Sequence, residues 1–152
     1  MTRLKLALAA AAGSAALLAG AFTFQLMGYA PCHLCWLQRY PHMAAVAVGV
    51  LVLIFGPTPI LLLLGALAAL ATAGLGVFHA GVEQKWWEGP NTCTSGDITQ
   101  VSPDALLDQI MAAPLIRCDE IAWSLMGISM AGWNAILSFL LALLWLKALR
   151  RA

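Results

Sequence analysis

Charge is what this sequence has least of. Only 10% of its 152 residues are charged and 62% are hydrophobic, whereas a soluble domain is typically about 25% charged and about 45–50% apolar. So few charged side chains cannot cover a water-facing surface, which argues against a soluble globular enzyme and against a disordered chain. The formal net charge of +1 argues against a nucleic-acid binder. The composition predicts a small integral membrane protein of one domain.

Long apolar segments fill the places from which charge is absent. A helix needs about 20 apolar residues to cross the hydrocarbon core of a bilayer. Four segments reach that length, and the second is the weakest because Arg39, Pro41 and His42 fall in its first third. The predicted spans cover residues 4–27, 35–55, 59–81 and 121–146, with outer loops at about 28–34 and 82–120. We therefore expect an all-α membrane protein that folds as a single four-transmembrane-helix bundle.

Acidic residues are absent outside residues 83–120, and the two ends of the chain carry only basic charge. The basic residues at the ends are Arg3, Lys5, Lys147, Arg150 and Arg151. Four spans place both termini on one side, and basic segments remain in the cytoplasm. We expect cytoplasmic termini and outer loops in the periplasm or exterior. A cleaved signal peptide ending near residues 19–21 is the alternative for the first segment, but its apolar stretch continues to Met27, which favours a retained span.

Two local patterns refine this expectation. Small residues recur at spacings of three and four in the third and fourth spans, which lets membrane helices approach closely. In the larger outer loop, Ser102, Pro103 and Asp104 are typical of a helix start. Apolar residues follow on one face, so we expect a short amphipathic helix there, either along the membrane surface or packed on the bundle.

The four cysteines all fall on the predicted outer side, where an oxidising compartment permits disulfides. They are Cys32, Cys35, Cys93 and Cys118. Three connectivities are possible, and pairing of sequence neighbours is the natural one. A C-x-x-C closes a short loop and stabilises little, but it is common at redox sites because its thiols tune each other's pKa. The Cys93/Cys118 pair is either a second redox pair or a structural disulfide. Structural zinc sites usually have two short-spaced pairs, so no metal is expected.

Arg39 falls inside a predicted span, whereas Lys5 lies only at the edge of one. If the second helix begins near Cys35, its positive end favours a thiolate there. Arg39 follows four residues later on the same face, where a guanidinium would favour the thiolate further. A charge within the membrane is costly and indicates function, although a side chain that reaches out to the interface is the alternative.

Residues 32–39 (CHLCWLQR) resemble the C-x-x-C-x-x-x-R of the bacterial disulfide bond formation protein B (DsbB) family. Residues 78–83, the loop cysteines Cys93 and Cys118, and residues 124–134 are also similar to that family. The resemblance covers about residues 5–146. Gln38 stands where some members carry a glutamate.

The resemblance implies an enzyme of the bacterial inner membrane that reoxidises a periplasmic thioredoxin-like (DsbA-like) disulfide donor. It implies that electrons pass to a quinone of the lipid bilayer, ubiquinone or menaquinone. Mapped by motif, Cys93 takes the mixed disulfide with the partner and Cys118 attacks Cys32. Cys35 is then left as a thiolate facing quinone, with Arg39 beside it and His79 lining the same site. The sequence contains no dinucleotide-binding glycine fingerprint, which agrees with a lipid-soluble acceptor.

Two other functions stay open at this point. One is a four-span scaffold with purely structural disulfides. The other is an enzyme like vitamin K epoxide reductase, a family that also has a four-helix core. In that family, however, the C-x-x-C falls near the last core helix, whereas here it follows the first predicted span.

Overall fold

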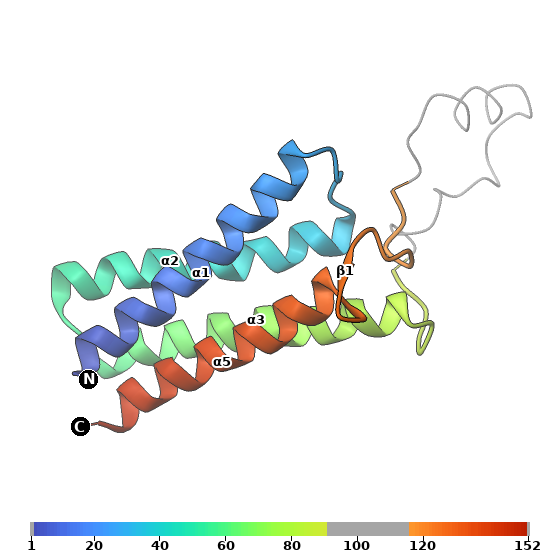
Figure 1. Ribbon diagram of the computed structural model, residues 1–152. Helices are drawn as coiled ribbons and strands as arrows, with labels where there is room; N and C mark the ends of the chain where they lie inside the picture. The colour runs from blue at the N-terminus through green and yellow to red at the C-terminus, as the bar shows by residue number, and fades with distance from the viewer. Residues whose placement is uncertain (1, 91–115, 152) are drawn as a thin grey trace, which may run out of the picture.

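The computed structural model describes residues 2–90 and 116–151. Within these residues, four long helices form a bundle in which both ends of the chain lie together, opposite the end that holds a small hairpin (Figure 1). The helices are α1 (Arg3–Leu26), α2 (His33–Phe55), α3 (Pro59–Glu83) and α5 (Met130–Arg150), and the hairpin strands are β1 (Ser124–Leu125) and β2 (Ile128–Ser129). All four helices are long and apolar enough to cross a membrane, which confirms the expected all-α four-helix bundle. The amphipathic helix expected after residue 102 lies outside the described residues.

The fourth predicted span, residues 121–146, is wrong at its start. Its first part is an antiparallel hairpin that pairs Ser124 with Ser129 and Leu125 with Ile128. Met126 and Gly127 between the strands have φ of 54° and 78°, the combination that a type I′ turn requires. The helix begins only after Ser129, whose hydroxyl accepts the backbone N–H of Gly132 at 3.2 Å. Hydrophobicity alone does not distinguish this apolar hairpin from a helical turn.

Small residues set the spacing between α3 and α5. Gly76 of α3 is buried, and a Cβ added there would lie 2.9 Å from the backbone nitrogen of Ala135 in α5. Gly65, near the other end of α3, would meet the Trp145 ring at 2.6 Å. The small residues of α3 and α5 therefore meet, but Ser124 and Gly127, which were expected on the same face of the fourth span, belong to the hairpin.

The core changes character along the bundle axis. At the end that holds the chain termini, buried apolar side chains form one cluster, with Leu6, Val52, Leu62 and Trp145 among its largest members. At the opposite end a smaller cluster contains Cys32, Leu34, Val82 and Cys118. We refer to these as the termini end and the cysteine end. The predicted chemistry belongs to the second.

Candidate functional site

The C-x-x-C forms the start of α2. Cys32 is the N-cap residue, and its sulfur accepts the backbone N–H of Cys35 at 3.2 Å. The helix therefore begins at His33, two residues before the predicted start, because the Cys32 side chain satisfies an N–H of the first turn. Cys35 lies in that first turn, at the positively polarised end of the helix.

The two sulfur atoms of this motif face each other 2.7 Å apart, and both residues are free cysteines. Because a disulfide bond is about 2.03–2.05 Å long, only a small displacement separates the reduced pair from the oxidised one. The hydrogen bond to the Cys35 sulfur, together with burial, raises the pKa of the Cys32 thiol. The two sulfurs are therefore close enough to share a proton.

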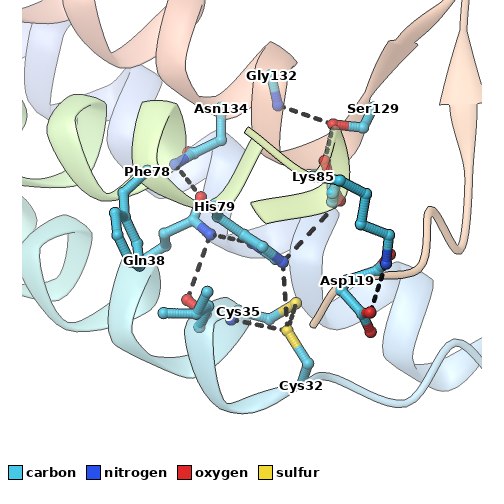
Figure 2. A network of polar contacts seen from close by, with 12 residues as sticks. Cys32, Cys35, Gln38, Phe78, His79, Lys85, Asp119, Ser129, Gly132 and Asn134 are labelled. Atoms are coloured by element: carbon cyan, nitrogen blue, oxygen red, sulfur yellow. Dashed lines mark hydrogen bonds and ion pairs between the residues drawn. The ribbon is translucent and has the colours of Figure 1, made fainter. Parts of the chain in front are cut away.

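His79 reaches this pair from α3, as Figure 2 shows. Its Nε2 lies 3.6 Å from the Cys32 sulfur and 3.9 Å from Oε1 of Glu83. The side chains of His79 and Glu83 are only 5% and 6% exposed, and the Ser129 hydroxyl donates a hydrogen bond to the Glu83 carboxylate. An imidazole and a carboxylate are thus buried beside the dithiol, and the hairpin holds the carboxylate through Ser129.

Sequence reasoning missed a buried polar network behind His79. Gln38 of α2 contacts His79, and its Oε1 accepts a hydrogen bond from Asn134 of α5 at 2.7 Å. Asn134 continues the network to His42 at 2.8 Å and to the Thr72 hydroxyl at 3.1 Å. The signal that pointed to it was present, because polar side chains inside apolar spans are costly and indicate function.

Arg39 is buried against α1. It is only 5% exposed, and its guanidinium donates to Oε1 of Gln25 at 2.7 Å and to the carbonyl of Ala21 at 3.3 Å. The rings of Phe22 and Trp36 lie 4.7 and 4.6 Å from its central carbon, a cation–π arrangement. Side chains and backbone of α1 and α2 therefore surround the guanidinium.

A cavity of about 440 Å³ connects Arg39 with the dithiol. Cys32, Cys35, Arg39 and His79 line one part of it, and small or apolar residues of α1, such as Ala16 and Gly20, line another. Its volume is typical of a small-molecule site, and a mostly apolar wall with a few polar groups is the usual composition. A flat apolar ring that carries hydrogen-bond-accepting oxygens fits this lining, with Arg39 as the donor.

Cys118 joins the site from the segment before the hairpin. It is fully buried, disulfide-bonded and packed in the same cluster as Cys32. The carboxylate of the next residue, Asp119, binds both Arg117 and Lys85, and these hydrogen bonds hold the pKa of Asp119 well below its usual range. The predicted partner, Cys93, lies outside the described residues.

Three ligand atoms at the site lie close enough to share a metal ion. The sulfurs of Cys32 and Cys35 and a ring nitrogen of His79 all lie within 4.8 Å of one another. Two thiolates and an imidazole are donors that Zn²⁺ and Cu⁺ accept. Whether His79 presents a lone pair to such an ion depends on its tautomer.

The chain is similar in sequence to known proteins of one family. The sequence model of the family described as "Disulfide bond formation protein DsbB" matches residues 3–148. The disulfide bond formation protein B of Marinobacter nauticus is 34% identical over 145 residues, which cover 90% of this chain and 86% of that protein. The protein of the same name from Verminephrobacter eiseniae is 34% identical over 154 residues, covering 96% and 85% of the two chains.

A third relative, disulfide bond formation protein B 2 of Pseudomonas syringae pv. syringae, is 35% identical over 130 residues, covering 79% of this chain and 72% of the relative. No solved structure matches the chain at a significant level. The described part of the chain has four helices that are long and apolar enough to cross a membrane, and a free dithiol at the start of one of them. Because the family model also matches nearly its whole length, the chain belongs to the DsbB family of membrane-spanning, disulfide-forming oxidoreductases.

Proposed function

We propose that this protein is a protein-dithiol:quinone oxidoreductase of the bacterial inner membrane. It reoxidises a periplasmic thioredoxin-like (DsbA-like) protein and passes the electrons through the Cys93/Cys118 pair and then the Cys32/Cys35 pair to ubiquinone or menaquinone. The observation that carries the proposal is the free dithiol on an apolar cavity that also contains Arg39.

The first exchanges take place between sulfurs and conserve the number of disulfides. A thiolate of the reduced partner attacks Cys93, the Cys93/Cys118 bond breaks, and Cys118 leaves as a thiolate. Cys118 then attacks Cys32, the Cys32/Cys35 bond breaks, and Cys35 leaves as a thiolate. The packing of Cys118 against the Cys32 cluster supports this second attack.

Two further exchanges release the oxidised partner. The partner's second thiolate attacks its own mixed disulfide and frees Cys93, which then attacks Cys118 and releases Cys32 as a thiolate. The partner now carries a disulfide, the Cys93/Cys118 bond is restored, and two electrons reside on Cys32 and Cys35.

Thiol–disulfide exchange needs a terminal acceptor, and a bound quinone supplies one that takes up two electrons and two protons. Arg39 is placed to hold a carbonyl oxygen of such a ring, since its hydrogen bonds to the described residues use only two of its nitrogens. The small side chains of α1 leave room for the ring, and Cys35 supplies the sulfur that faces the same cavity. The mostly apolar lining keeps bulk water away from the thiolate.

The proposed topology places both termini in the cytoplasm and the cysteine end in the periplasm. The five basic residues at the termini end support it. Reporter fusions at Pro57 and Ala152 are expected to report cytoplasm, and a fusion at Gly96 is expected to report periplasm. A periplasmic signal at Ala152 contradicts this topology.

The decisive experiment gives the purified protein a reduced thioredoxin-like donor and follows the absorbance of added quinone. The wild-type protein is expected to reduce quinone in proportion to donor oxidised. Cys35→Ala is expected to abolish quinone reduction, and Cys118→Ala to accumulate a mixed disulfide between Cys93 and the donor because the resolving thiol is missing.

The same assay separates the proposal from a scaffold with structural disulfides. A scaffold neither oxidises the donor nor reduces quinone. If the double variant Cys93→Ala/Cys118→Ala oxidises the donor at the wild-type rate, the loop pair is structural and the relay through it is wrong.

A further inference from the structure

The amide group of Gln38 has only one orientation that its surroundings allow. Its Nε2 lies 3.2 Å from the backbone carbonyl oxygen of Leu34 and 2.8 Å from Nδ1 of His79. A carbonyl oxygen can only accept a hydrogen bond, so the atom that faces Leu34 is the NH₂ group. That group has two N–H bonds, of which one points to Leu34 and the other to His79.

Asn134 fixes the same orientation from the opposite side. Its Nδ2 lies 3.4 Å from the backbone carbonyl of Thr72, again an obligatory acceptor, and 2.7 Å from Oε1 of Gln38. The NH₂ group of Asn134 therefore donates to the Gln38 oxygen. Two backbone carbonyls on different helices thus determine the direction of both hydrogen bonds.

The orientation of Gln38 determines the tautomer of His79. Because an N–H of Gln38 points at Nδ1, that nitrogen must be the acceptor, and in neutral imidazole the proton is then on Nε2. The Nε2–H bond faces the Cys32 sulfur at 3.6 Å, while the nearest oxygen of Glu83 lies further away, at 3.9 Å (Figure 2). The backbone of Cys118 also accepts a hydrogen bond from His79, so the Nε2–H lies between that backbone group and the Cys32 sulfur.

We infer that Gln38 is a positioning residue that holds His79 in the Nε2–H tautomer, so that His79 stabilises negative charge on the Cys32 sulfur. This inference rests on the proposed function, in which the last exchange breaks the bond between Cys118 and Cys32. The electron pair of that bond goes to Cys32, and the N–H of His79 is placed to stabilise it without transferring a proton. Hydrogen bonds to charged groups are stronger than neutral ones.

The network has a single direction from α5 to the active-site sulfurs. Asn134 donates to Gln38, Gln38 donates to His79, and the Nε2–H of His79 faces Cys32, whose sulfur lies 2.7 Å from that of Cys35. Hydrogen bonds that run in one direction polarise one another. This network therefore directs the positive end of each bond toward the Cys32 sulfur, which the last exchange of the proposed function releases as a thiolate.

The same tautomer disfavours metal binding at the dithiol. A metal ion held by Cys32, Cys35 and His79 needs the lone pair of Nε2, which carries the proton here. Replacing Gln38 by glutamate reverses the pattern, because a carboxylate accepts a hydrogen bond from Nδ1–H and leaves Nε2 free. A carboxylate behind a metal-binding histidine is the usual arrangement in metal sites.

The first test is a ¹⁵N NMR spectrum of the reduced, histidine-labelled protein in detergent micelles. The chain has three histidines, His33, His42 and His79, so a spectrum of His79→Ala assigns the signals of interest. We expect wild-type His79 to be protonated at Nε2 and unprotonated at Nδ1, and Gln38→Glu to place a proton on Nδ1. Ser138→Ala is the matched control, because it removes a network hydroxyl that contacts His42 and Asn134 but not Gln38.

A wild-type His79 protonated at Nδ1 overturns the inference, as does a Gln38→Glu spectrum identical to the wild-type one. The wild-type spectrum alone decides the tautomer if Gln38→Glu does not fold. Neither measurement contains quinone or a donor protein, so the tautomer stands or falls separately from the proposed electron transfer.

The second test measures binding of Co²⁺, whose thiolate complexes absorb visibly, to the reduced protein. The Cys93→Ala/Cys118→Ala background removes the other thiols of the chain. We expect Gln38→Glu to bind Co²⁺ about 10- to 100-fold more tightly than wild type, the range over which such supporting residues change metal affinity. If wild type and Gln38→Glu bind Co²⁺ with equal affinity, and His79→Ala weakens Co²⁺ binding in both, the inference is overturned.

Discussion

The two ends of the bundle are built from the same four helices by opposite means. At the termini end, alanine and leucine side chains pack around Trp145 and Leu62, and a glycine lies directly beneath the indole ring. At the cysteine end, buried Gln38 and His79 and half-buried Asn134 are joined by short hydrogen bonds across three helices. Apolar packing has no preferred direction, whereas hydrogen bonds lose strength quickly when they are misaligned.

The two ends of the bundle therefore have different structural roles. The termini end fixes how far apart the helices lie, and the cysteine end fixes where individual atoms and protons lie. Substitutions at the cysteine end should therefore change turnover more than stability. Substitutions at the termini end should do the reverse.

The largest effect is expected from Arg39→Ala at the cysteine end. In the proposed function the guanidinium donates to an oxygen of the acceptor, and losing one charge-assisted interaction costs about 1.5–3 kcal/mol. Steady-state quinone reduction is expected to slow by roughly ten- to a hundred-fold, while exchange between the donor and the loop cysteines continues. Arg39→Lys keeps the charge without the planar fork and should retain part of the activity.

Thermal unfolding of the same variants distinguishes a role in turnover from a structural one. Arg39 also ties α2 to Gln25 and Ala21 of α1. Unchanged quinone kinetics in Arg39→Ala, combined with a lower melting temperature, would mean that the residue serves only to join the two helices.

An intermediate effect, on stability alone, is expected from Gly65→Ala at the termini end. The new Cβ would lie 2.6 Å from ring carbons of Trp145, and overpacking of this kind typically costs about 1–3 kcal/mol. Gly74→Ala on the same helix is the matched control, because no atom lies within 4 Å of its added Cβ. We expect a lower melting temperature in detergent for Gly65→Ala only, with wild-type turnover per folded molecule.

The control sharpens the comparison. Alanine is a better helix former than glycine by roughly 0.5–1 kcal/mol, so Gly74→Ala should be neutral or slightly stabilising. If Gly65→Ala proves as stable as Gly74→Ala, the contact with Trp145 does not set the helix spacing.

The sequence was sufficient for the features that depend on neighbours along the chain. Apolar length predicted the helices, and Cys32, Cys35 and Arg39 were identified from their spacing within eight residues. The hairpin was missed because its turn depends on a left-handed conformation at Met126, which methionine does not signal. The pairing of Gln38 with Asn134 was missed because 96 positions separate the two residues, and they meet only because α2 and α5 both pack against α3.

The smallest effect is expected from Asp119→Asn, beside Cys118 but on the surface. Ion pairs with Arg117 and Lys85 hold the pKa of Asp119 below its usual value, yet exposed pairs contribute little to stability. We expect the melting temperature to fall by at most about 2–4 °C at neutral pH.

A carboxylate whose pKa is lowered by folding contributes stability above its unfolded pKa, about 3.9, and loses it as the pH falls toward the folded value. The difference between variant and wild type should therefore be constant above about pH 5 and shrink below about pH 4. A difference that persists unchanged at low pH would assign the effect to the backbone contact between Lys85 and Asp119, which protonation of the carboxylate does not remove.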